Sequence, residues 1–228
     1  MKNKLTTIVA ALLLSTTCLF AQDVTHDPKA KSILDELSAR LKTYTSVSAE
    51  FTHTMVDKAD PDMNDSYQGK LLTKGKSYKI EVLGQHIISN GKIVWNHIPD
   101  EDGPGEVSIE DVPDDEDADD NIFSPTNIFK FYEKGFKYKY DKELVVKGVT
   151  CDQIKLFPEE IEDKGYHTVK LIVNRAKKQI LSVVILMKDG MVYTYDITKF
   201  VVNLSLQDSI FNFDTKKYPG IEVNDLRM

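Results

Sequence analysis

The side chains of this chain that could do chemistry are few and widely separated. Its 228 residues include five histidines and two cysteines. The histidines do not form the HExxH arrangement that holds zinc on a helix, and the cysteines form no CxxC pair. We therefore expect no metal and no cofactor. The histidines are His26, His53, His86, His97 and His167.

Cys151 and His167 are the pair that could act as nucleophile and base. A catalytic cysteine needs a neighbouring group that lowers its pKa. The sequence around Cys151 supplies none, and the chain has no GxSxG, phosphate-loop or dinucleotide motif. We interpret Cys151 as a packed residue in a strand and His167 as a surface residue, and we predict that the protein is not an enzyme.

An acidic segment is the remaining candidate for chemistry. Residues 100–120 are dominated by aspartate and glutamate and contain Gly103, Pro104, Gly105 and Pro113. Clustered carboxylates can bind calcium, but the spacing is not that of an EF-hand. The composition predicts a charged, solvated loop, with weak calcium binding as the alternative.

The first 21 residues have the pattern of a secretory signal peptide. Lys2 and Lys4 precede the short apolar run 8–14, and Ala21 stands before polar residues. The run is too short to anchor the chain in a bilayer. We expect cleavage after Ala21, a periplasmic location, and a single domain over residues 22–228.

The cysteine in this segment raises the question of a lipid anchor. Cys18 follows Ser15-Thr16-Thr17, which does not fit a lipoprotein signal. We therefore place it in the removed peptide, and Cys151 then has no partner for an internal disulfide. The net charge of −7 becomes −9 when the two lysines of the signal leave. An acidic chain without a basic stripe is not expected to bind nucleic acid.

The first element of the mature chain is predicted to be a helix. Asp27 is a favourable N-cap, and Pro28 suits the first helical position. Apolar residues recur every three or four positions and make one face of about four turns. These residues are Ile33, Leu34, Leu37, Leu41 and Tyr44.

Strands dominate the rest of the chain. Apolar and polar residues alternate over 47–55, and further strands are expected at 69–74, 77–83, 136–140, 153–157, 168–173, 179–187 and 191–200. Asn90-Gly91 predicts a type I′ hairpin within 87–95, and Asp189-Gly190 predicts a second tight hairpin. Ser124-Pro125 predicts a short second helix carrying Ile128 and Phe129. The fold class is therefore mainly β, an antiparallel meander covered by an N-terminal and a central short helix.

Two of these strands are apolar on both faces. The run 180–187 and the run 93–95 do not alternate as a strand with one wet face would. Either helices cover both faces, or one face lines an apolar cavity for a hydrophobic ligand. Few helices are predicted for so many strands, which favours the cavity.

The order of several short motifs resembles one family. The segment 44–52, Gly69-Lys70-Leu71, the hairpin 89–95, Ser124-Pro125, and the segments 208–213 and 218–223 together resemble the periplasmic outer-membrane lipoprotein carriers of the LolA type. The resemblance extends over nearly the whole mature chain.

This resemblance implies an unclosed antiparallel β-barrel with a helical lid. Its apolar cavity would take up the acyl chains of lipoproteins that an inner-membrane transporter releases, and would pass them to an outer-membrane acceptor. The expected form is a monomer. Family members often carry Arg-Pro after the G-x-L strand, where the arginine latches the lid. Lys74-Gly75 stands at that place, so either Lys74 is the latch or this chain has none.

The carrier hypothesis requires a lid that competes with the cargo. Ten sheltered methylene groups would contribute about 8 kcal/mol, so a rigid open cavity would release its ligand slowly. A lid that covers the empty cavity offsets part of this energy. The predicted lid residues are Ile33, Leu34, Leu37, Leu41, Ile128 and Phe129. The predicted cavity wall consists of Phe51, Leu71, Tyr78, Ile80, Trp95, Ile185 and Met187.

Three other functions remain compatible with the sequence. The same fold could serve as a lipid-binding sensor or regulatory module of the envelope, or as a generic binder of hydrophobic molecules. A hydrolase acting through Cys151, His167 or the acidic segment is the third.

Overall fold

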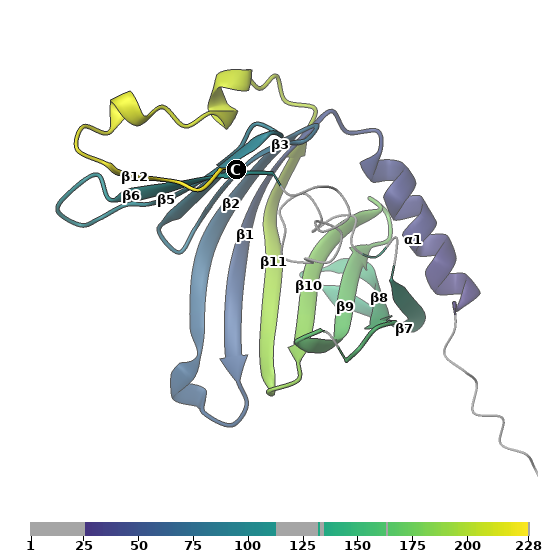
Figure 1. The fold of residues 1–228 in the computed structure, drawn as a ribbon. Helices are drawn as coiled ribbons and strands as arrows, with labels where there is room; N and C mark the ends of the chain where they lie inside the picture. The colour runs from purple at the N-terminus through teal and green to yellow at the C-terminus, as the bar shows by residue number, and fades with distance from the viewer. Residues whose placement is uncertain (1–25, 113–131, 133–134, 163, 228) are drawn as a thin grey trace, which may run out of the picture.

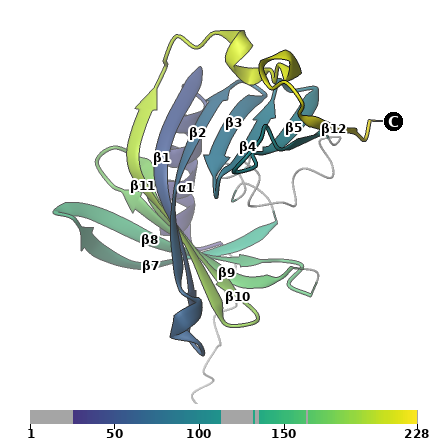
Figure 2. The same ribbon diagram turned by 90° about the vertical axis from the view of Figure 1, so that its left-hand side faces the viewer.

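One large β-sheet with a single α-helix against it forms the described part of the molecule (Figure 1). The computed structural model describes residues 26–112, 132, 135–162 and 164–227. The sheet has twelve strands, and Figure 2 shows that the strands at its two ends run in clearly different directions, because the sheet twists strongly.

Among the described residues the helix is α1 (Pro28–Leu41), and short 3-10 turns are η1 (Pro61–Met63), η3 (Asp208–Phe211) and η4 (Thr215–Lys217). The strands are β1 (Ser46–Asp57), β2 (Asp65–Lys74), β3 (Ser77–Val82), β4 (Gln85–Ser89), β5 (Ile93–Ile98), β6 (Glu106–Asp111), β7 (Phe136–Val146), β8 (Val149–Pro158), β9 (Tyr166–Asn174), β10 (Gln179–Met187), β11 (Met191–Val202) and β12 (Glu222–Asp225).

The strand order is that of a meander in two halves. The sheet runs β12-β6-β5-β4-β3-β2-β1-β11-β10-β9-β8-β7, and the pairing of β1 with β11 joins the halves. All neighbours are antiparallel except β12, which pairs parallel to β6. β12 and β7 are open edges, so the sheet does not close on itself. The predicted mainly β, antiparallel and unclosed fold is confirmed.

The strand register divides the sheet into two faces with different coverings. We call the face that carries Ala49, Leu71 and Leu171 the inner face, and the face that carries Trp95 and Val107 the outer face. α1 packs on the inner face and joins the larger hydrophobic cluster there. The C-terminal segment packs on the outer face through Phe213, where a smaller cluster forms.

The sequence determines α1 as expected. The Asp27 side chain accepts hydrogen bonds from the backbone N–H groups of Lys29 (2.8 Å) and Ala30 (3.2 Å), which caps the helix. The same residue fixes the helix to β7, because the N–H of Tyr140 donates to the Asp27 carboxylate at 3.2 Å. The central helix predicted after Ser124 lies outside the described residues.

The prediction of a loop over 100–120 is wrong for part of its length. Glu106–Asp111 is strand β6, in which Val107 is fully buried and Ile109 is 9% exposed. The valine and isoleucine alternate with polar residues at the period of a strand, and they pack under the C-terminal segment. The acidic residues from 114 onward lie outside the described residues.

The first hairpin forms where predicted, but its turn is displaced by one residue. Ser89 pairs with Val94, and the N–H of Asn90 donates to the Ile93 carbonyl, so Gly91 and Lys92 take the central places. Only Gly91 has a positive φ, +86°, which is the pattern of a type II′ turn and not of the predicted type I′ turn.

No helix among the described residues has the length and apolar character needed to cross a membrane.

Candidate functional site

The candidate site is the part of the inner face formed by β1, β2, β3 and β11. Within the described residues, α1 packs mainly on β7 and β10, to one side of these strands (Figure 1). Apolar and aromatic residues predominate among their inner side chains, and many of these are only partly buried. A surface of this kind is suited to a hydrophobic ligand. The partly buried residues are Met55, Ile80, Val82, Tyr193, Tyr195 and Ile197.

His53 lies within this surface, on β1. Its ring stacks on Tyr195 with a centroid distance of 4.5 Å and an interplanar angle of 5°, and it meets Tyr193 edge-on at 5.9 Å. The side chain is 8% exposed, and its Nε2 atom has no hydrogen-bond partner among the described residues. Burial lowers the pKa of His53 and raises that of Tyr195 to about 12. Both rings are therefore neutral at pH 7.

Phe51 is held on the inner face by a close approach to Gly69. The two residues are cross-strand partners, and the phenyl ring lies over the glycine. A Cβ atom at Gly69 would stand 2.3 Å from Cζ of Phe51. The glycine of the G-x-L motif is thus required here because it leaves room for an aromatic ring.

The structure brings most of the predicted wall residues together on the inner face. Phe51, Leu71 and Ile185 are buried in the inner cluster, and Ile80 and Met187 pack against it. Tyr78 is two residues from Ile80 on β3, so the register places it on the same face. Burial raises the pKa of its phenol.

Trp95 does not belong to this wall. It pairs with Ile88 on one side and Ile109 on the other, and all three belong to the outer cluster with Phe213. Ile87 pairs with the inward-facing Ile80, and Asn96 pairs with Ile87, so Asn96 also faces inward. Trp95 is the neighbour of Asn96 on β5 and therefore faces outward. The run 93–95 is apolar on both faces, and the C-terminal segment covers its outer face.

The predicted lid is placed in part. Ile33, Leu34 and Leu37 are buried against the inner cluster, and Leu41 is partly buried beside it. The apolar face of α1 therefore packs on the inner face. Ile128 and Phe129 lie outside the described residues.

Lys74 contacts the C-terminal segment and not α1. Its Nζ atom donates to the Leu206 carbonyl at 2.8 Å and forms an ion pair with Asp208 at 2.7 Å. Lys74 pairs with Ser46, next to the inward-facing Val47, so its side chain leaves the sheet on the outer face. Lys74 therefore holds the segment after β11 and does not act as the predicted latch of the helix.

The enzymatic alternative has no geometric support in Cys151 and His167. β9 pairs Cys151 with Asn174, seven residues away from His167 along the strand, which corresponds to about 23 Å. Burial raises the pKa of the Cys151 thiol, the opposite of what a nucleophile needs. In the described part of the chain, no three His, Cys, Asp or Glu side chains are grouped to hold a metal.

A buried polar network that the sequence analysis missed lies near the start of α1. Asp152 is 3% exposed and accepts hydrogen bonds from Arg175 Nε at 2.9 Å and from the Tyr140 hydroxyl at 3.2 Å. Arg175 also pairs with Glu143 at 2.7 Å. These residues come from β7, β8 and the turn after β9. The network therefore depends on pairing across the sheet, which spacing along the chain does not reveal.

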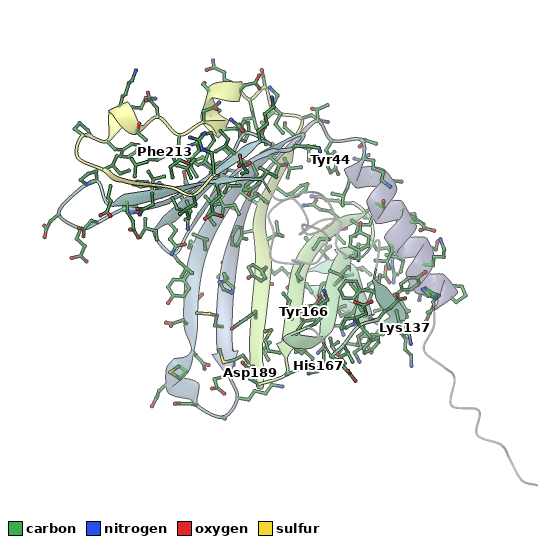
Figure 3. The ribbon with its side chains drawn as sticks, in the orientation of Figure 1. Tyr44, Lys137, Tyr166, His167, Asp189 and Phe213 are labelled. Atoms are coloured by element: carbon green, nitrogen blue, oxygen red, sulfur yellow. The ribbon has the colours of Figure 1, made fainter. Side chains whose placement is uncertain are left out.

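His53 was also missed as a polar group in the site. Figure 3 shows the labelled Asp189 and His167 toward the lower end of the sheet, and Phe213 and Tyr44 near its upper end. The signal for His53 was present in the sequence, since it occupies an inward position of the alternating run from Val47 to Met55. It is the polar residue in a series whose other members are apolar.

Comparison with solved structures places the fold among known ones. An uncharacterized conserved protein from Thermus thermophilus superposes with a TM-score of 0.54 at 14% identity, covering 87% of this chain and 98% of that one. The two chains share a fold. A LolA superfamily protein from Nitrosomonas europaea matches with a TM-score of 0.43 at 14% identity, covering 81% of this chain and 98% of that one.

A third match is the lipoprotein LppX of Mycobacterium tuberculosis, with a TM-score of 0.48 at 10% identity and coverage of 80% of this chain and all of that one. Neither a scan against protein-family models nor a search of the curated proteins gave a match.

Proposed function

We propose that this protein is a periplasmic carrier that binds the acyl chains of lipoproteins on the inner face of its sheet and carries them from the inner to the outer membrane. The observation that carries the proposal is the partly buried apolar surface of β1, β2, β3 and β11 beside α1. The motif resemblance to LolA-type carriers supports the same role. An inner-membrane releasing transporter and an outer-membrane acceptor are the partners this role requires.

The physical basis of binding is burial of hydrocarbon. Each acyl methylene that leaves water contributes about 0.8 kcal/mol, and the inner face offers aromatic and aliphatic side chains as partners. The buried face of α1, with Leu37 at its centre, would act as the lid whose contacts the cargo replaces. In this role the working form is the monomeric mature chain, residues 22–228, after removal of the signal peptide 1–21.

A pair of neighbouring substitutions tests the proposal. Met55 and Thr54 are both partly buried on β1, but they point to opposite faces of the sheet. Met55 lies opposite the exposed Asp65 of β2, and we expect Met55→Glu to weaken binding strongly, because it replaces an apolar contact by a second carboxylate that hydrocarbon can cover only at a desolvation cost. Thr54→Glu adds the same charge to the outer face and should bind as the wild type does.

The measurement is retention of a lipoprotein in solution. The mature protein is mixed with a detergent-solubilised acylated lipoprotein, the detergent is removed, and complex formation is followed by size-exclusion chromatography, with the unacylated lipoprotein as control. An acyl-dependent complex that Met55→Glu loses supports the carrier. Binding of free lipids without lipoprotein would favour the sensor or the generic binder. Equal binding by both variants would show that the binding site does not lie on the inner face.

A further inference from the structure

His53 carries a buried polar atom, Nε2, that the described residues leave without a hydrogen bond. The imidazole is more than nine-tenths buried, and this nitrogen meets no hydrogen-bond partner among the described residues. A buried polar atom without a partner destabilises the fold. Phenylalanine would fill the same space and stack on Tyr195 without that cost. A hydrogen-bond partner from outside the described chain would therefore remove this cost.

The surroundings of His53 define the chemistry of that partner. Tyr195 covers one side of the ring, and Phe51 and Met55 precede and follow it on the same face of β1, each about 7 Å away along the strand. A ligand that reaches Nε2 must place one polar atom there and hydrocarbon on either side. The neutral imidazole can take its Nε2–H tautomer, in which it donates one hydrogen bond, and a ligand that offers acceptors but no donor selects this tautomer.

An ester carbonyl within a long acyl lipid has this arrangement. It offers acceptor oxygens and no donor, and it is flanked by methylene groups. We propose that His53 is a specificity-determining residue that donates a hydrogen bond from Nε2 to an ester carbonyl of the bound lipid. This inference rests on the proposed function and names the part of the cargo that the inner face recognises.

The test compares two lipids that differ only at the carbonyl. One is a fluorescently labelled lipopeptide with a dipalmitoylglyceryl cysteine, and the other is its dipentadecyl ether analogue, which has the same fifteen-carbon tails without the carbonyls. Both bury the same hydrocarbon, so only the ester can accept a hydrogen bond from His53 through a carbonyl. We expect the wild type to bind the ester about three to ten times more tightly, as one hydrogen bond allows.

Two variants separate His53 from the rest of the surface. His53→Phe keeps an aromatic ring against Tyr195, and we expect it to bind ester and ether alike and to be at least as stable as the wild type. His167→Phe makes the same exchange at an exposed residue of β9, and it should retain the preference for the ester. In the wild type labelled with ¹⁵N-histidine, the Nε2 resonance of His53 should shift with the ester and not with the ether.

Three results would overturn the inference. Equal affinity of the wild type for ester and ether removes the carbonyl contact while leaving the carrier function in place. A preference that persists in His53→Phe assigns recognition to another residue. Failure of either lipid to bind the wild type rejects the proposed function and this inference together. The comparison of the two lipids on the wild type, read together with the ¹⁵N shift of His53, needs no variant and decides the matter even if His53→Phe does not fold.

Discussion

Gly69 and Phe51 show how a single missing side chain shapes the inner face. We expect Gly69→Ala to lower the free energy of unfolding by about 1–3 kcal/mol, because the new methyl group overlaps the Phe51 ring and forces it to move. Chemical denaturation measures the change. Gly103→Ala is the matched control, since a Cβ atom there has no neighbour within 4 Å.

The double variant Gly69→Ala with Phe51→Leu adds a sharper check. A smaller side chain at position 51 should recover part of the stability that the alanine removes, so the two changes should not be additive. A Gly69→Ala protein as stable as the wild type would show that the Phe51 ring does not lie over the glycine.

The buried carboxylate of Asp152 predicts a pH dependence of stability. Hydrogen bonds from Arg175 lower the pKa of Asp152 below its ordinary value of 3.8. A lowered pKa in the folded state contributes stability above the ordinary pKa and loses it as the pH falls through the folded value. We therefore expect wild type to exceed Asp152→Asn in stability at pH 7, with the difference shrinking below about pH 4.

Thermal unfolding of both proteins across pH 2.5–7 measures this difference. Asp35→Asn is the control, because Asp35 is an exposed helix residue paired with Lys31 at the surface. A gap between wild type and Asp152→Asn that stays constant down to the lowest pH would contradict the assigned role of the carboxylate.

At the scale of elements, the C-terminal segment acts as the cover of the outer face. Phe213 stacks on Tyr218 at 4.8 Å and packs on His97 at 5.0 Å. We expect Phe213→Ala to cost about 3 kcal/mol and to loosen this segment locally, since the rest of the sheet has its own core. Hydrogen exchange should accelerate in β6 and β12, where Leu226 donates to the Ile109 carbonyl, and stay slow in β8 and β9.

The matched variant for this prediction is Lys216→Ala, an exposed residue of the same segment. It should leave exchange unchanged throughout. Acceleration spread evenly over all strands in Phe213→Ala would mean that the outer cluster is part of one cooperative unit with the inner core.

The elements that depend on local signals could be predicted from the sequence. The cap formed by Asp27 and the alternation along β1 depend on neighbours in the chain, and both elements form as expected. Strand β6 was not predicted from the sequence, because its buried residues lie within a segment rich in acidic residues. The face of Trp95 could not be predicted, because alternation separates it from Val94 and Asn96 but does not say which set faces α1. That choice follows from non-local strand pairing, as does the Asp152 network.

At the scale of the whole molecule, the sheet has a candidate binding surface on its inner face and a region covered by the C-terminal segment on its outer face. The inner face carries the partly buried aromatic residues, while Phe213 and its neighbours cover the outer face of β4, β5 and β6. The chain has one tryptophan, Trp95, and it lies on the outer face. Its fluorescence therefore reports on the side of the sheet opposite to the proposed cargo.

This sidedness predicts the outcome of a quenching experiment. A lipopeptide with brominated acyl chains quenches tryptophan only at close range, so it should leave the emission of Trp95 in the wild type largely unchanged as it binds. The same lipopeptide should quench a tryptophan placed on the inner face, in the double variant Trp95→Phe with Tyr193→Trp. Strong quenching of Trp95 together with an unquenched inner-face tryptophan would place the cargo on the outer face, and would require the C-terminal segment, not α1, to move when cargo enters.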